Sequence, residues 1–468
     1  MIRHLVAAAL LLSALSTDKW LEDFHQILDE MSSHYANLDS AINDRRIDLP
    51  GLKKRTEDAI RQAKSDDDAK REIERFLQAF GDGHVDVKWP AGETATKDEA
   101  KPKAKTLCER FGYDQPIRPG VNFARLAEYR ADDDADSKEF PGGVLTLAKN
   151  RRAGIVRISL FDAHTHPALC GAAEASLKLA PDVECDFECE IGLQTRVENA
   201  LTAALERRVA SLRKEGATAI VIDLTRNGGG SDWVEPAARV LTPVALKSPR
   251  IGFLRHPHWV TDFESRLKDI EHDLGQHDDP TLREAQRVVT RALEIAKAPC
   301  DHTGVWNDPP AAAKCPMVES NLLYASGYLP YAKPGSVKAD WARGILFSPS
   351  RYEYHEGANT LPLYVLVDRY SASASEYFVA MLKDNKAATI IGETTLGAGC
   401  GHTNGGVWAT LKNSGGKLSL PDCARFRADG TNEITGIIPD ILVPWSPSDS
   451  AYQRAAKTKK ALENAIAP

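Results

Sequence analysis

The sequence of 468 residues lacks several features that would define particular classes of protein. It has no excess of positive charge, because 59 lysines and arginines face 66 acidic residues and the formal net charge is −7. A nucleic-acid-binding surface is therefore not expected. It has no internal repeat, and its one long apolar run, residues 5–15, is too short to span a bilayer comfortably.

The N-terminal segment and the cysteines indicate an exported protein. Residues 1–16 have a charged start, an apolar core and small residues before Thr17, which is the pattern of a secretory signal peptide. Eight cysteines fit an oxidising compartment. We therefore expect a periplasmic or secreted protein that keeps no stable membrane span once the signal is removed.

The even number of cysteines permits full pairing into disulfide bonds. Proximity along the chain predicts the pairs Cys300–Cys315 and Cys400–Cys423. Cys185 and Cys189, which lie among acidic residues, are an alternative metal-binding pair, although their spacing is not that of a zinc site.

The length predicts more than one domain. The expected parts are a signal peptide 1–16, a helical N-terminal domain 17–90 with amphipathic helices over 17–43 and 53–79, a linker or mixed segment 91–143, a core 144–447 with an insertion 247–345, and a C-terminal helix 448–468. Buried strands and helices alternate in the core. This alternation predicts an α/β fold with a mostly parallel sheet.

The stretch 361–399 organises the core. An apolar run, 361–367, predicts a buried strand, and the run 377–383 predicts a helix. Ser373 lies between them, where the free N–H groups of the helix start would stabilise negative charge. Ser373 is therefore a candidate nucleophile, and the alternative is that the serines of this turn only cap the helix.

A glycine turn follows another predicted strand, 217–224. Parallel strands end at the same sheet edge, so Asn227–Gly230 is expected to lie near Ser373. Glycine lets a backbone approach a ligand closely. The amides of Gly228 or Gly229 and of Ala374 are therefore candidate oxyanion-hole donors; the alternative is a plain flexible turn.

Four ordered motifs carry a resemblance to a known family. They are IDLTRNGGG at 222–230, SASASEYF at 371–378, GETTLGAG at 392–399 and EITGIIPDI at 433–441. In these motifs the sequence resembles the C-terminal-processing and tricorn-like serine peptidases, a group that includes interphotoreceptor retinoid-binding protein. The resemblance implies a crotonase-like (ClpP/crotonase) core, Ser373 as nucleophile, an oxyanion hole at Ala374 and Gly228 or Gly229, and no cofactor.

The resemblance also indicates the general base. The processing-peptidase branch uses a lysine where this sequence has Ala398, and it carries a PDZ domain that is not recognisable here. The tricorn-like branch uses a histidine in a D-G-H turn, which matches Asp82-Gly83-His84. It also uses a glutamate that falls on Glu433. We therefore expect a serine-type peptidase acting on peptides or unfolded proteins through Ser373, His84 and Glu433.

Two other functions are compatible with the sequence. A non-catalytic binding protein of the same fold could use the tyrosines of the insertion, Tyr324, Tyr328 and Tyr331, to line a ligand pocket. A metal-dependent hydrolase could use His164 and His166, whose spacing resembles the metal motif of amidohydrolases. The sequence makes no prediction of oligomeric state.

Overall fold

The computed structural model describes residues 15–90, 106–133, 135–178, 184–298, 300–313, 315–403 and 406–466. Residues 1–14 of the predicted signal peptide, and residues 91–105 and 134 of the predicted linker or mixed segment, therefore lie outside the described residues. The chain divides into two compact units. The first comprises Met1–Ala95, Pro299–Met317 and Gly405–Asp422; the second comprises Thr96–Ala298, Val318–Asn404 and Cys423–Pro468.

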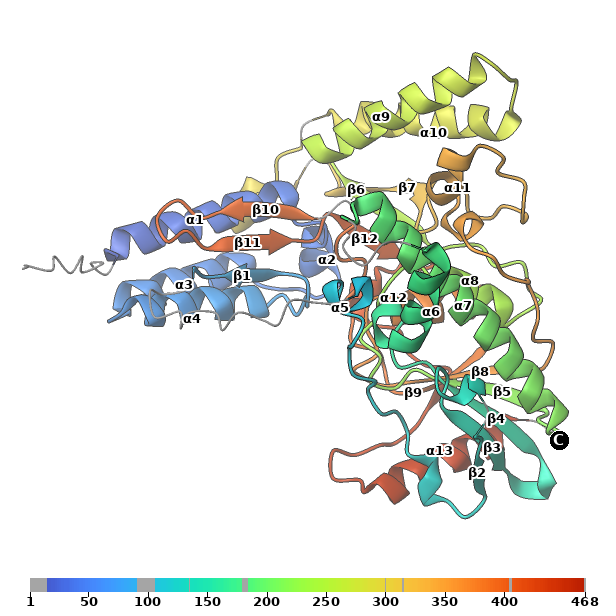
Figure 1. Cartoon of the computed structure of the whole chain (residues 1–468). Helices are drawn as coiled ribbons and strands as arrows, with labels where there is room; N and C mark the ends of the chain where they lie inside the picture. The colour runs from blue at the N-terminus through green and yellow to red at the C-terminus, as the bar shows by residue number, and fades with distance from the viewer. Residues whose placement is uncertain are drawn as a thin grey trace, which may run out of the picture. The chain divides into compact units, whose positions relative to one another are not determined.

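A seven-stranded sheet forms the centre of the second unit (Figure 1). Its order is β13 (Ile441–Leu442), β9 (Thr389–Gly392), β8 (Leu363–Val367), β5 (Ala219–Asp223), β4 (Arg152–Arg157), β3 (Gly142–Thr146) and β2 (Tyr129–Ala131). The strands from β13 to β4 are parallel, whereas β3 and β2 pair antiparallel. The predicted parallel sheet is thus confirmed for the strands that carry the site.

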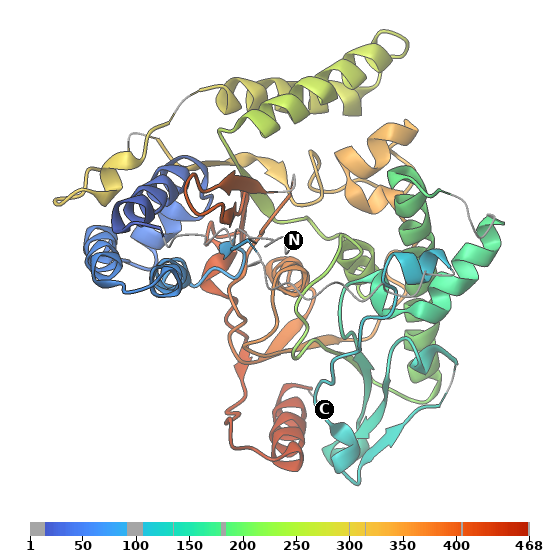
Figure 2. The same ribbon diagram turned by 60° about the vertical axis from the view of Figure 1, so that its left-hand side comes forward.

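Helices cover both faces of this sheet. The long helix α7 (Phe187–Lys214), α8 (Val234–Val240) and α12 (Ala374–Asp384) pack on one face, and α13 (Ala451–Ala465) packs on the other (Figure 2). The strand β5 serves both layers because its side chains alternate: Ile220 and Ile222 face α7, while Ala219 and Val221 face α13. This alternation explains its continuous apolar run.

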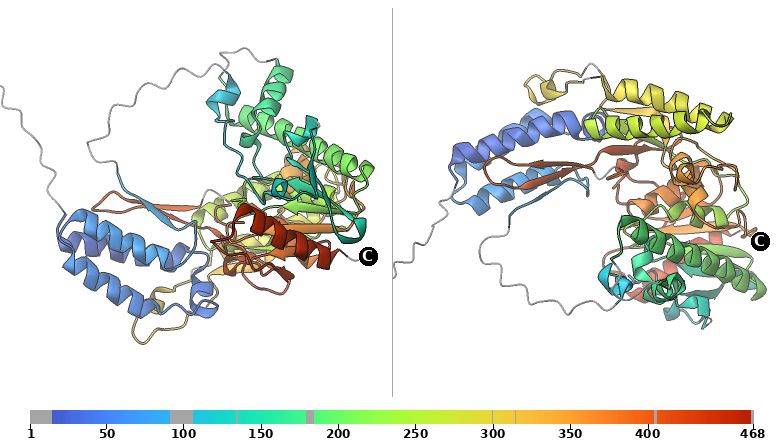
Figure 3. Two further views of the ribbon diagram at one scale, coloured as in Figure 1. Left: turned by 90° about the horizontal axis from the view of Figure 1, so that it is seen from below. Right: turned by 45° about the horizontal axis from the view of Figure 1, so that its top comes forward.

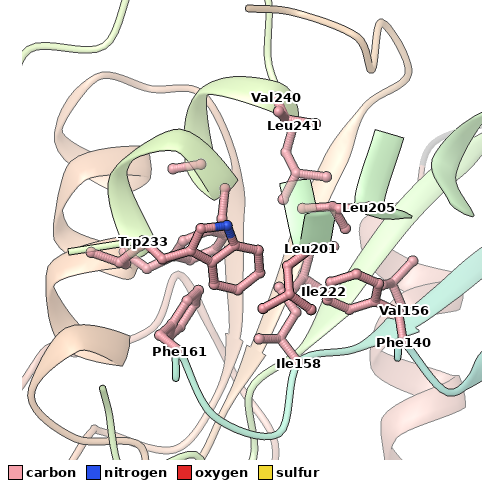
Figure 4. Close-up of a cluster of buried hydrophobic side chains, with 14 of the residues drawn as sticks. Phe140, Val156, Ile158, Phe161, Leu201, Leu205, Ile222, Trp233, Val240 and Leu241 are labelled. Atoms are coloured by element: carbon pink, nitrogen blue, oxygen red, sulfur yellow. The ribbon is translucent and has the colours of Figure 1, made fainter. Parts of the chain in front are cut away.

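Large side chains fill the layer between the sheet and α7 (Figure 4). Trp233 and Phe161 are fully buried, and Phe140 stacks on Trp233 with ring centroids 6.1 Å apart. The indole Nε1 of Trp233 donates to the hydroxyl of Thr202 at 2.9 Å, so its polar atom is satisfied. Burial of each aromatic ring contributes about 2 to 3 kcal/mol.

The predicted insertion contributes two strands of an antiparallel sheet and contains a helical hairpin. The sheet joins β12 (Cys423–Phe426), β6 (Arg250–Leu254) and β7 (Val318–Tyr324), in that order. The hairpin pairs α9 (Pro257–Leu274) with α10 (Pro280–Ala296), which lie side by side in Figure 1. The helix α10 coincides with the charged, helix-like run 280–298 of the sequence, whereas α9 was not predicted. Shorter helices of this unit are α5 (Leu107–Arg110), α6 (Pro167–Leu177) and α11 (Asp340–Leu346).

Helices and one small sheet make up the first unit (Figure 3). The helices are α1 (Thr17–His34), α2 (Leu38–Asn43), α3 (Leu49–Gln62) and α4 (Asp66–Gln78). The predicted helix over 53–79 is thus two helices, because Ser65 begins α4 by accepting the Asp68 amide. Strand β1 (Asp86–Lys88) pairs with β11 (Lys417–Leu420), which pairs with β10 (Val407–Thr410).

All eight cysteines form disulfide bonds. The predicted pairs Cys300–Cys315 and Cys400–Cys423 are confirmed. The remaining pairs are Cys108–Cys170 and Cys185–Cys189, so the metal-binding alternative for the last two cysteines is wrong. Across the described ranges, no helix combines the length and the apolar character that crossing a bilayer requires.

Candidate active site

Ser373 occupies a strained turn between β8 and α12. Its backbone has φ 54° and ψ −114°, and the helix α12 begins at the next residue. A residue other than glycine in such a conformation costs about 1 to 3 kcal/mol, and strain of this kind concentrates at functional sites. A serine on a sharp strand-to-helix turn is the arrangement that exposes a nucleophile at a sheet edge.

The three serines of this turn have different roles. Ser371 is fully buried, and its hydroxyl donates to the Leu224 carbonyl at 2.9 Å. Ser375 is also fully buried, and its hydroxyl donates to the Asn227 carbonyl at 3.0 Å. Ser373 alone of the three is partly exposed. The flanking serines therefore hold the turn, and Ser373 is the one that a substrate can reach.

The predicted glycine turn lies against Ser373. A methyl group at Gly229 would lie 2.8 Å from Ser373 Cβ and 2.9 Å from the Ala374 nitrogen, so only glycine allows this approach. Asn227 fixes the turn, because its Oδ1 accepts the Gly229 amide at 2.9 Å and its Nδ2 donates to the Ile158 carbonyl at 3.0 Å. The Gly229 amide thus already donates a hydrogen bond within the turn and is not free to donate to an oxyanion.

Two amides near Ser373 remain as candidate oxyanion donors. The N–H groups of Gly228 and Ala374 have no acceptor within the part of the chain that the structure describes. Ala374 also begins α12, where the helix dipole favours negative charge. Of the two glycines predicted as oxyanion donors, Gly228 is the better candidate, because the Gly229 amide already has an acceptor.

The side chain of Glu376 holds the serine turn in place through hydrogen bonds. Its carboxylate is fully buried and accepts the Ser373 amide at 2.9 Å. The same carboxylate accepts four donors of the loop after β9, which are Thr395 Oγ1 and the amides of Gly397, Ala398 and Gly399. Glu376 was not among the predicted site residues, although the spacing Ser-x-x-Glu is that of a capping box. The carboxylate joins the serine turn to a second loop.

Arg425 joins Ser373 to Glu433. Its Nε donates to Glu433 Oε2 at 2.6 Å, and its Nη2 donates to the carbonyls of Ser373 at 3.0 Å and Gly399 at 2.9 Å. Burial raises the pKa of Glu433 above its ordinary value, and Arg425 opposes that rise. The other oxygen, Oε1, is buried and has no hydrogen-bond partner among the described residues. Glu433 thus retains one acceptor that the second unit does not satisfy.

His84 lies in the turn between α4 and β1, within the first unit. The Asp82 carboxylate accepts the His84 amide at 3.0 Å and lies 3.6 Å from His84 Nδ1. Tyr35 and Asn37 donate to the other oxygen of Asp82, at 3.1 and 2.9 Å. Asp82 is therefore held firmly beside the imidazole. Asp82 was predicted only as part of the D-G-H motif, and its contact with the His84 ring was not predicted.

A pocket of about 340 Å³ adjoins the serine turn. Ala374, Gly230 and Arg425 line the part near Ser373, and Ile251, Trp259, Leu323, Tyr324 and Tyr328 line much of the rest. Tyr331 does not line it and instead donates its hydroxyl to Glu356 at 3.1 Å. The insertion thus supplies both apolar walls and the charged side chains of Asp262 and Arg266 to the pocket beside the candidate nucleophile.

The two histidines of the metal alternative serve separate carboxylates. His164 Nδ1 hydrogen-bonds Asp162 at 2.5 Å, and its ring stacks on Tyr113. His166 Nδ1 pairs with Glu139. Within the described ranges, no group of three or more such side chains could hold a metal ion. The geometry therefore does not favour a metal-dependent hydrolase.

The fold and this arrangement define an α/β protein with a candidate serine nucleophile at a helix start. A model of peptidase family S41 matches residues 311–443. This segment contains Ser373, Glu376, Arg425 and Glu433, and it is similar to the peptidase domain of that family. The resemblance predicted from the motifs is therefore confirmed.

Two named relatives match in sequence. The carboxyl-terminal-processing protease of Synechocystis sp. is 33% identical over 111 residues, which are 21% of this chain and 25% of that protein. The chloroplastic carboxyl-terminal-processing peptidase 2 of Arabidopsis thaliana is 35% identical over 101 residues, which are 20% of this chain and 18% of that protein. The chain thus spans a quarter or less of the relatives that it matches.

The likeness in structure extends over nearly the whole chain. Mature CPAF complexed with lactacystin aligns with a TM-score of 0.57 and 13% identity, covering 96% of this chain and 98% of CPAF. At this identity the likeness establishes the fold. The predicted crotonase-like α/β class is confirmed.

Proposed function

We propose that this protein is a serine peptidase that cleaves peptide bonds through an acyl-enzyme on Ser373. The observation that carries the proposal is the strained, partly exposed Ser373 at the start of α12, packed against Gly229 within the segment that matches the S41 family. The substrate is a peptide or an unfolded protein, and the reaction as proposed uses no cofactor.

The backbone amides supply electrostatic stabilisation. When Ser373 Oγ attacks the scissile carbonyl, the new C–O bond places negative charge on the carbonyl oxygen. The amides of Gly228 and Ala374, which have no acceptor among the described residues, would donate to that oxyanion. Removal of one such donor typically slows catalysis by about 10²- to 10³-fold.

His84 acts as the base in this proposal. Neutral imidazole takes the Ser373 proton during attack and returns it to the leaving amine, and water then hydrolyses the ester with the same proton shuttle. An imidazole is the side chain best suited to exchange a proton near neutral pH. Two carboxylates are candidates to stabilise the imidazolium: Asp82, held 3.6 Å from Nδ1, and Glu433, which keeps one unsatisfied oxygen.

The pocket beside Ala374 provides a place for a substrate side chain. Its lining is mixed: Trp259 and Leu323 would contact apolar parts of that side chain, and Asp262 and Arg266 would contact polar parts. The signal-like residues 1–16 and the four disulfide bonds support export to the periplasm or the medium.

A serine-reactive fluorophosphonate probe tests the nucleophile. The full chain should become labelled, and Ser373→Ala should abolish both labelling and hydrolysis of β-casein. Ser336→Ala, at an exposed serine elsewhere in the same unit, should retain both. Labelling that persists in Ser373→Ala would refute the assignment. Absence of labelling and hydrolysis in the native protein, with retained peptide binding, would favour the binding-protein alternative.

A comparison of Asp82→Asn with Glu433→Gln identifies the residue that orients His84. The orienting residue should lose about 10²- to 10⁴-fold in kcat, because the imidazolium loses its stabilising charge. His84→Gln provides the reference for complete loss of the base. If His84→Gln retains native kcat and a native pH profile, His84 is not the base.

A further inference from the structure

Arg118 lies beside the glycine turn of the proposed oxyanion hole. A methyl group at Gly228 would lie 3.5 Å from Arg118 Nη1. Arg118 is exposed, and it belongs to a segment without regular secondary structure between α5 and β2. The guanidinium is thus within reach of a ligand that contacts the Gly228 amide.

The backbone around Arg118 is fixed. Pro119 restricts the preceding residue to extended conformations. The Arg118 carbonyl accepts Arg157 Nη2 at 3.1 Å, and the Val121 amide donates to Asp223 Oδ2 at 2.8 Å. The Gln115 amide also donates to the His164 carbonyl at 3.2 Å. The position of the guanidinium beside Gly228 therefore follows from an anchored main chain.

The positive charge of Arg118 has no partner in the described part of the chain. Among the described residues no carboxylate lies within ion-pair distance of it, in contrast to the exposed Arg207 and Arg369, which pair with Asp136 and Glu393. The buried acid near this segment, Asp223, is already occupied by the Val121 amide and by the amide and hydroxyl of Thr225.

We propose that Arg118 binds a carboxylate of the substrate close to the scissile bond, and so makes the peptidase selective for peptides that carry an acidic group there. The proposal rests on the proposed function. The planar guanidinium presents parallel N–H donors that match a carboxylate. An extended peptide advances about 3.3 to 3.6 Å per residue, so a carboxylate one or two residues from the scissile carbonyl would reach Arg118. This substrate carboxylate belongs either to an acidic side chain or to the C-terminus of the peptide.

Matched peptides distinguish these two sources. The parent is a ten-residue peptide centred on the main β-casein cleavage site or, if the native protein cleaves no β-casein, the overlapping β-casein peptide that binds Ser373→Ala most tightly in fluorescence polarisation. For each of the two positions that flank the scissile bond, one peptide carries glutamate there and its matched partner carries glutamine. In a further pair, the peptide ends two residues beyond the scissile bond as a carboxylate or an amide. The native protein should prefer the acidic member of one pair by about fivefold in kcat/KM. Equal kcat/KM within every pair would overturn the proposal.

Variants of Arg118 assign the preference to this side chain. Arg118→Gln should abolish it, Arg118→Lys should retain part of it, and Arg118→Glu should reverse it towards a peptide with lysine at the same position. Arg287→Gln, which removes an exposed charge from α10, is the charge-matched control and should keep the native preference. An unchanged preference in Arg118→Gln would refute the role of Arg118.

Binding to Ser373→Ala separates this proposal from the proposed function. Fluorescence polarisation with the same labelled peptides needs no turnover. Tighter binding of the acidic peptide that disappears in the Ser373→Ala, Arg118→Gln double variant supports the carboxylate site, even if the native protein hydrolyses nothing. Equal binding of the acidic and neutral peptides to Ser373→Ala would overturn the carboxylate site, whatever the activity.

Discussion

Replacement of Glu376 by glutamine tests whether one buried carboxylate holds the serine turn. Oε1 of Glu376 accepts Thr395 Oγ1 and the Gly397 amide, both at 2.6 Å. Oε2 accepts the amides of Ser373 and Ala398 at 2.9 Å, and that of Gly399 at 3.3 Å. Glutamine keeps the shape of the side chain but replaces one acceptor with a donor.

The expected cost follows from these donors. The new NH₂ group is best placed at Oε1, because the Thr395 hydroxyl can turn and accept it, but the Gly397 amide then has no acceptor. An unsatisfied buried amide costs about 1 to 3 kcal/mol. The three bonds that remain lose their charge assistance, about 1 kcal/mol each. Because the neutral amide is easier to bury, we expect a net loss of about 2 kcal/mol or more.

Urea unfolding and the rate of probe labelling measure the effect. Glu376→Gln should lower the free energy of unfolding and slow labelling of Ser373, since the turn that presents the hydroxyl is released. Glu284→Gln is the matched control, because this exposed glutamate of α10 has only a surface pair with Arg287. If Glu376→Gln costs less than about 0.5 kcal/mol and labels at the native rate, then the network does not hold the serine.

Three further perturbations have definite expected outcomes. Gly229→Ala should slow probe labelling by about 10²-fold or more, because a methyl group there would lie 2.8 Å from Ser373 Cβ at a backbone φ of 111°; labelling at the native rate would contradict the close approach. Replacement of both Cys400 and Cys423 by serine should lower the free energy of unfolding by about 3 kcal/mol, since their bond closes a loop with a sequence separation of 23 residues; an unchanged urea midpoint would show that the bond does not constrain the unfolded chain. The hydrogen bond that His164 donates to Asp162 raises the pKa of His164. The resulting stabilisation is complete below the pKa of an unfolded histidine, about 6.5, and is lost as the pH rises through the higher folded value. The stability of the native protein should therefore decline above about pH 6.5 relative to that of His164→Asn, and parallel pH profiles would disprove the contribution.

Many strands and helices of the second unit were predicted from the sequence, because the residue patterns that indicate them lie within short segments. The runs over 217–224 and 361–367 are continuous and apolar, since both faces of β5 and β8 are covered by helices. The helix α9 carries a comparable local signal, with Trp259, Phe263, Leu267, Ile270 and Leu274 at helical spacing, and the prediction missed it. The pairing of β1 with β11 also escaped prediction, because it joins segments more than three hundred residues apart in the sequence.

The site was predictable to the extent that its chemistry lies in short motifs. Ser373 and the glycines of 227–230 have a recognisable order and spacing. The acceptor of the Gly229 amide is not readable in this way, because it is the side chain of Asn227 in one rotamer. The role of Arg425 likewise depends on tertiary packing that brings its guanidinium under the Ser373 carbonyl.

The strain at Ser373 persists because both sides of its backbone are bonded to buried charges. Its amide donates to the Glu376 carboxylate at 2.9 Å, and its carbonyl accepts Arg425 Nη2 at 3.0 Å. Hydrogen bonds to charged groups each contribute about 1.5 to 3 kcal/mol, so the two together exceed the roughly 1 to 3 kcal/mol of strain. Arg425 also binds Glu433 at 2.6 Å. A displacement of Glu433 would therefore be transmitted to the Ser373 peptide through one guanidinium, and the nucleophile and the candidate orienting acid are mechanically coupled.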